Sequence, residues 1–119
     1  MRISISTPKG TIHGVLNDSV AAQTFAAQLP ITITFNDLLG REKYGKLPSG
    51  ISLKGKRIFH FEKSLIAYWS PGNDFVLFYN YDGEPIPAPG LIALGRITKG
   101  VSILSELTSS FTASISLSK

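Results

Sequence analysis

Apolar and polar residues alternate along most of this chain, which is the pattern of a β-strand with one buried face. Residues 2–7 and 11–16 both alternate, with the turn Pro8-Lys9-Gly10 between them, so they predict a hairpin. Further strands are predicted at 31–35, 57–61, 65–70, 75–81, 91–97 and 111–117. Pairing the first strand with the last would close this mainly β sheet of eight strands into a barrel and leave no exposed edge.

Two segments have the apolar spacing of a helix. Residues 20–29 are rich in Ala, follow the candidate N-caps Asn17-Asp18-Ser19 and stop at Pro30. After the turn at Gly100, apolar residues recur at 101, 104 and 107, as on one face of a short helix. We therefore expect two short capping helices, at about 18–29 and 100–107.

Glycine and proline mark the loops between these elements. Residues 36–55 contain four glycines and are predicted as a loop, and residues 71–74 are predicted to connect a hairpin. Residues 82–90 hold three of the seven prolines and predict an extended surface loop.

Composition narrows the class of protein. A length of 119 residues fits one domain, which we take as 1–119. The chain has no Cys, which excludes disulfides and thiol chemistry. His13 and His60 are far apart and lack metal-ligand spacing, so no metal and no cofactor are expected. No apolar run approaches the ~20 residues of a membrane helix. We expect a cytoplasmic protein that does not act at a membrane.

The net charge of +4 is concentrated in one segment. Seven of the 12 Lys and Arg residues lie between positions 41 and 63, namely Arg41, Lys43, Lys46, Lys54, Lys56, Arg57 and Lys63. A local positive field of this kind attracts anions or nucleic acid. The segment has neither helical spacing nor an aromatic stacking platform, so a solvated loop is favoured and nucleic acid is not the expected partner.

Three blocks of the chain resemble the small bacterial and archaeal cyclophilin-like proteins. They are residues 29–37 with 40–43 and 47–48, residues 66–79, and residues 91–97 with Gly100 and the helix that follows. The order and spacing of the blocks carry the resemblance, which covers nearly the whole chain. It implies a closed eight-stranded barrel capped by two helices, on the cyclophilin plan.

The same resemblance bears on activity. True cyclophilins are prolyl isomerases, and their pocket holds an arginine in a Phe-His-Arg context that polarises the substrate backbone. The nearest match in this chain is Phe59-His60-Phe61, which places Phe61 where the arginine would be. The only methionine is Met1, so a pocket Met is missing as well. Because the arginine stabilises the twisted amide electrostatically, its loss removes most of the rate. We expect no active isomerase.

A candidate binding site follows from the loop and the aromatic hairpin. Residues 40–44 bring a guanidinium, a carboxylate and a phenol together, and residues 68–79 supply aromatic surface. We predict that a ligand binds where these two segments meet. The candidate residues are Arg41, Glu42, Tyr44, Tyr68, Trp69 and Phe78.

Three functions fit these observations. The first is a barrel that binds a small molecule or an extended peptide at the candidate site. The second is a divergent peptidyl-prolyl cis-trans isomerase, and the third is anion or nucleic-acid binding through residues 41–63. Neither the identity of a ligand nor the oligomeric state follows from the sequence.

Overall fold

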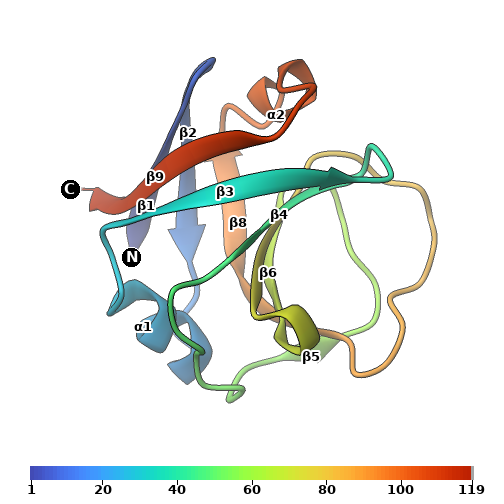
Figure 1. Cartoon of the computed structure of the whole chain (residues 1–119). Coiled ribbons are helices and arrows are strands. Elements are labelled where there is room, and N and C mark those ends of the chain that lie inside the picture. The colour runs from blue at the N-terminus through green and yellow to red at the C-terminus, as the bar shows by residue number, and fades with distance from the viewer. Residues whose placement is uncertain (119) are drawn as a thin grey trace.

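The computed structural model of the chain describes residues 1–118. Figure 1 shows strands wound into a barrel, with a helix at each end and two long loops on one side. The elements are β1 (Arg2–Thr7), β2 (Gly10–Leu16), α1 (Val20–Ala26), β3 (Ile31–Leu38), β4 (Glu42–Lys46), β5 (Arg57–Ile58), β6 (Leu65–Trp69), η1 (Ser70–Gly72), β7 (Asp74–Phe78), β8 (Leu91–Lys99), α2 (Ile103–Glu106) and β9 (Phe111–Ser118).

Eight antiparallel strands close the barrel in the order β2-β1-β9-β3-β4-β7-β6-β8, and β8 pairs back onto β2. The two terminal strands are neighbours, with Ile5 opposite Ile115. Ile3, Ile5 and Ile115 are fully buried because alternate residues of each strand point inward. These pairings confirm the predicted mainly β, closed eight-stranded barrel with two short helices.

The eight strands differ in one member from the predicted set. The segment 36–55, predicted as a loop, contains the end of β3 and all of β4, joined by a tight turn in which Leu39 and Gly40 have φ of 58° and 65°. The predicted strand 57–61 is reduced to the two residues of β5, which pair only with the start of β8. The sequence EKYGK of β4 has no apolar alternation, so its place in the sheet depends on partners far away in the chain.

Both helices are shorter than predicted. The first ends at Ala26 rather than Leu29, and the second spans only four residues. The predicted N-cap is confirmed, since Ser19 Oγ accepts a hydrogen bond from the Ala22 N–H at 3.0 Å. Phe25 of α1 reaches into one barrel mouth and stacks on Phe75, with ring centroids 4.6 Å apart. Within residues 1–118, no helix is long and apolar enough to span a bilayer.

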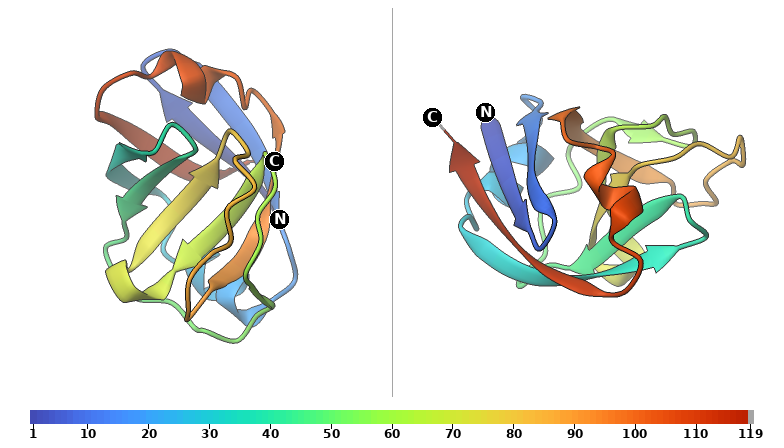
Figure 2. Two further views of the ribbon diagram at one scale, coloured as in Figure 1. Left: turned by 90° about the vertical axis from the view of Figure 1, so that its right-hand side faces the viewer. Right: turned by 90° about the horizontal axis from the view of Figure 1, so that it is seen from above.

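Apolar side chains form two clusters on opposite faces of the sheet. The larger fills the barrel interior and includes Ile3, Phe25, Phe35 and Phe75. The smaller lies on the outer face of β6 and β7 and consists of Phe61, Ala67, Val76, Phe78, Ile86 and Leu91. The two long loops, residues 59–64 and 79–90, cover this outer face and face the viewer in the left part of Figure 2. They are linked by the Ile86 N–H, which donates to the Phe59 carbonyl at 2.8 Å.

Candidate functional site

A cavity of about 290 Å³ opens on the outer face of β4, β7 and β6, beneath the loop 79–90. We call it the outer-face cavity. Its wall is mostly apolar and comes from Leu38, Val76, Phe78, Ile86, Pro87 and Leu91. Five side chains add polar or aromatic character, namely Arg41, Glu42, Tyr44, Trp69 and Asp74. An apolar concavity with a few polar groups is the usual form of a small-molecule site.

Strand register explains how the lining residues converge. Glu42 lies opposite Phe78, and Tyr44 lies opposite Val76, so these four side chains leave the same face of the sheet. Asp74 pairs with Trp69 of the next strand and extends the row. Because side chains alternate between the two faces, all six point outward, away from the barrel interior.

Five of the six predicted site residues line the outer-face cavity, and Tyr68 does not. It points into the barrel core, where its hydroxyl donates to Asn73 Oδ1 at 2.5 Å. Its neighbour Trp69 points outward. The prediction grouped two consecutive strand residues on one face, which the two-residue period of a strand forbids.

The polar end of the cavity is an ion pair between consecutive residues. Arg41 donates from Nε and Nη2 to the same Glu42 oxygen, Oε1, at 2.9 and 2.6 Å. Its third nitrogen, Nη1, lies 3.5 Å from Asp82 Oδ2. The side chains of Arg41 and Glu42 are only 11% and 9% exposed. The guanidinium also lies over the Phe61 ring, 4.8 Å from its centroid, so the pair is embedded in the apolar cluster.

Burial dominates the protonation of both lining carboxyls. It raises the pKa of Glu42 above its usual value, and the hydrogen bond and charge of Arg41 offset this only in part. Burial also raises the pKa of Asp74, and the positive charge of Lys46 opposes that rise. Each carboxylate is therefore held in the cavity at a cost in solvation, which a ligand that donates hydrogen bonds would reduce.

Comparison with known proteins identifies the family of the chain. The model of the cyclophilin-like family matches residues 5–116. The chain belongs to the cyclophilin-like family. Among solved structures, the solution structure of a hypothetical protein from Archaeoglobus fulgidus is 22% identical, covers 99% of this chain and 95% of its own, and superposes with a TM-score of 0.79. At that identity it shows a shared fold. No curated protein matches the chain.

Phe61 belongs to the apolar cluster on the outer face of the sheet. In this cyclophilin-like chain the side chain of Phe61 packs on Phe78, with ring centroids 4.5 Å apart. The Arg41 guanidinium covers the same Phe61 ring from the β3–β4 turn. Arg41 thus lines the outer-face cavity and also packs on the outer apolar cluster.

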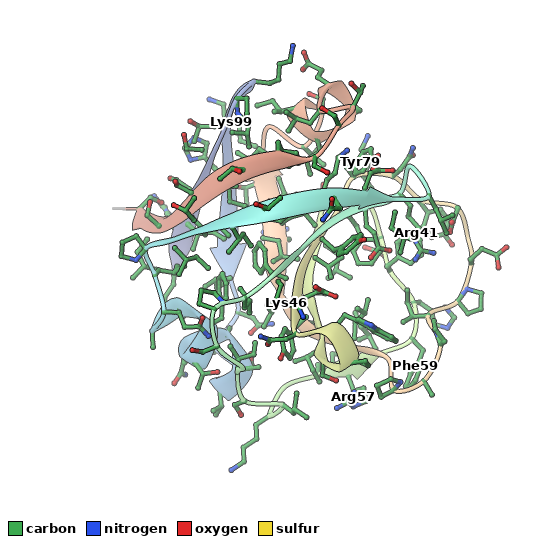
Figure 3. All side chains as sticks on the ribbon, in the orientation of Figure 1. Arg41, Lys46, Arg57, Phe59, Tyr79 and Lys99 are labelled. Atoms are coloured by element: carbon green, nitrogen blue, oxygen red, sulfur yellow. The ribbon has the colours of Figure 1, made fainter. Side chains whose placement is uncertain are left out.

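The basic segment 41–63 does not form one surface in this cyclophilin-like barrel. Arg41 lies at the outer-face cavity, whereas Lys43 is 2% exposed and points to the barrel end beneath α2. Lys43 Nζ donates to the Leu107 carbonyl at 2.6 Å and lies 3.1 Å from Asp37 Oδ1. Arg57 binds the Pro89 carbonyl, well away from Arg41 in Figure 3.

A second cavity, of about 420 Å³, lies across β1, β2 and β8. Arg2, His13 and Lys99 line it. It is the larger of the two, but Arg2 and Lys99 are exposed and none of its charged side chains is buried. Solvated charges bind a ligand weakly, so the outer-face cavity is the stronger candidate. Across residues 1–118, no three His, Asp or Glu side chains gather closely enough to hold a metal ion.

Sequence reasoning missed the roof of the cavity. Ile86 and Pro87 come from the loop 79–90, which folds back over strands that lie earlier in the chain. Asp74 could have been predicted to line the site, because it lies two residues before Val76 and both side chains are on one face of the strand. No local sequence pattern predicts that the loop 79–90 contacts this face of the sheet.

Proposed function

We propose that this cyclophilin-like barrel is a binding domain that takes a small molecule or a short extended peptide in the outer-face cavity. The observation that carries the proposal is the Arg41–Glu42 pair, which is buried at the edge of a cavity with an otherwise apolar wall. A buried ion pair is weak evidence for stability, because its desolvation offsets its attraction. A ligand site gives these two residues a role that stability does not.

The shape of the cavity supports an elongated ligand. A carboxyl lies at each end of it, Glu42 at one end and Asp74 at the other. Glu42 lies opposite Phe78, which is four residues from Asp74 along β7. At ~3.3 Å per strand residue, the ends are separated by roughly 13 Å. Val76 lines the cavity between them, with Tyr44 opposite it on β4 and Trp69 opposite Asp74 on β6. This span suits two or three residues of an extended peptide, or an elongated small molecule.

The charges around Arg41 support binding without isomerisation. Catalysis of prolyl isomerisation needs a donor aimed at the twisting amide. In this site two carboxylates, Glu42 and Asp82, already engage the Arg41 guanidinium. A ligand carbonyl would have to displace them. The divergent isomerase remains the second candidate, favoured by the position of Arg41 over Phe61.

Binding is tested by recording ¹H–¹⁵N spectra of the labelled protein with a set of apolar fragments and proline-containing tripeptides. We expect saturable shifts confined to residues of β4, β6 and β7 at the cavity. Tyr44→Ala should weaken binding, and Phe59→Ala, which removes an exposed aromatic outside the cavity, should not. Shifts spread over the whole surface, or equal losses in the two variants, would refute the proposal.

A further inference from the structure

The charge of the outer-face cavity is opposite to that of the chain. The protein carries a formal net charge of +4. Two carboxylates, Glu42 and Asp74, line the cavity together with one cation, Arg41. A third carboxylate, Asp82, lies 3.5 Å from that cation. Lys46 acts on Asp74 from the end of β4, but its side chain does not line the cavity and is exposed. Carboxylates therefore outnumber cations in the space that a ligand would occupy.

The hydrogen-bonding groups of the site are unequal as well. Both short bonds from Arg41 go to Glu42 Oε1, so the second oxygen, Oε2, accepts none from any residue of the described chain. Glu42 as a whole is only 7% exposed. The carboxylate of Asp74 likewise accepts no hydrogen bond within residues 1–118, and only burial and the charge of Lys46 act on it. Gln28 Oε1 is the one fully buried side-chain oxygen or nitrogen without a partner in residues 1–118, so these carboxylate oxygens keep some exposure, and a charged donor is their strongest partner.

Aromatic rings complete the site. Tyr44 lies opposite Val76, Trp69 opposite Asp74, and Phe78 opposite Glu42, and all three rings line the cavity. The face of an aromatic ring attracts a cation, most strongly when the site excludes water. Aromatic walls beside a carboxylate are thus complementary to an ammonium group on an apolar body.

We propose that the outer-face cavity selects ligands that carry a protonated amine on an apolar or aromatic body, with the ammonium bound at Glu42 Oε2. The inference rests on the proposed binding function and adds the ligand class. A carboxylate ligand would meet Glu42 and Asp74, and it would find Arg41 already engaged. An uncharged analogue would gain the apolar contacts alone.

Three matched probes test this selectivity on the intact protein. 2-Phenylethylamine, 2-phenylethanol and 3-phenylpropionate share the aromatic body and differ in the polar end. In ¹H–¹⁵N titrations at pH 7, we expect the amine to bind at least about tenfold more tightly than the alcohol, as expected for a charged hydrogen bond. The carboxylate should bind most weakly. This comparison requires no variant and does not depend on whether a variant folds.

A matched pair of variants assigns the effect to Glu42. Glu42→Gln should lower the affinity for the amine to that for the alcohol, whereas Glu62→Gln, at an exposed carboxylate outside the cavity, should leave the ratio unchanged. Equal binding of amine and alcohol, or tighter binding of the carboxylate, would overturn the inference while leaving the binding function intact. Absence of any shift at the cavity with all three probes would overturn both.

Discussion

Arg41 directs its Nε and Nη2 at a single oxygen of Glu42, at 2.9 and 2.6 Å, and leaves the other oxygen of that cavity-lining carboxylate without a hydrogen bond from residues 1–118. The two residues are consecutive, so this contact depends on the backbone turn at Leu39 and Gly40, which brings Arg41 alongside the start of β4. The arrangement uses one carboxylate for two purposes. One oxygen neutralises the guanidinium, and we propose that the other accepts from a ligand.

Arg41→Ala should destabilise the protein by about 3 kcal/mol at pH 7, because it leaves Glu42 as a buried charge without its partner. The pKa of Glu42 is already raised in the folded protein, and the variant raises it further. A group whose pKa is raised on folding contributes stability below its unfolded pKa and loses it as pH increases. The loss in Arg41→Ala should therefore grow between pH 5 and pH 8.

Urea unfolding at the two pH values measures this effect. Arg57→Ala is the matched control, since Arg57 is exposed and donates a hydrogen bond only to the Pro89 carbonyl. We expect it to cost under about 1 kcal/mol, the range of a single net hydrogen bond, and to show no added pH dependence. Equal and pH-independent losses in the two variants would show that the Arg41–Glu42 pair does not behave as a buried pair.

The structure predicts that Asp37 contributes to acid sensitivity. Burial alone would raise its pKa, but hydrogen bonds from Tyr79, the Gly40 N–H and Lys43 outweigh it and lower the pKa below the usual value. A carboxyl whose pKa is lowered on folding contributes stability above its unfolded pKa and loses it as pH falls through the folded value. Asp37→Asn should thus be least stable relative to the parent near neutral pH.

The gap between parent and Asp37→Asn should stay constant from pH 7 to about pH 5 and then narrow toward pH 3 in urea unfolding. Asp18→Asn, at an exposed aspartate ahead of α1, is the matched control. A gap for Asp37→Asn that stays constant across this range would mean that the variant acts through packing rather than through its charge.

Barrel closure depends on the last strand. β9 lies between β1 and β3, with Ile115 opposite both Ile5 and Ile31. Removing residues 110–119 would expose two strand edges and open the fully buried core at Ile5. We expect the truncated chain to lose cooperative thermal unfolding. A sharp transition near the melting temperature of the parent would contradict this account of the fold.

Much of this architecture could be predicted because most strands bury one face. Alternation at both ends of the chain identified β1, β2 and β9, and their pairing followed from barrel closure. β4 could not be found in this way. Its buried positions are taken by Glu42, Lys43 and Gly45. Glu42 pairs with Arg41, and Lys43 binds Asp37 and the Leu107 carbonyl. Gly45 packs closely against Thr34. A Cβ at Gly45 would lie 2.6 Å from the Thr34 carbonyl oxygen.

The site was predicted less completely than the fold, and the reason is similar. β6 and β7 are buried on both faces, inside by the barrel core and outside by the two long loops. Without alternation, the sequence does not say which of Tyr68 and Trp69 faces inward. That choice is set by register with Phe75 and Asp74, which only the assembled sheet provides.

We expect the protein to leave the rate of prolyl isomerisation at its uncatalysed value. The Arg41 guanidinium is already engaged by Glu42 and Asp82, so it is not free to polarise a bound amide. A coupled assay on a proline tetrapeptide checks this. Acceleration that persists through purification and disappears in Arg41→Lys would show that Arg41 supplies the missing group, and the divergent isomerase would become the better account.

We propose the outer-face cavity as a ligand site, and Trp69 reports on it directly. Trp69 is the only tryptophan in the chain and lines the cavity, so its indole N–H signal needs no assignment. Titration with 2-phenylethylamine should move this one signal saturably in the parent and far less in Glu42→Gln. An indole signal that stays fixed while signals near Arg2, His13 and Lys99 move would place the ligand at the other cavity and contradict the claim.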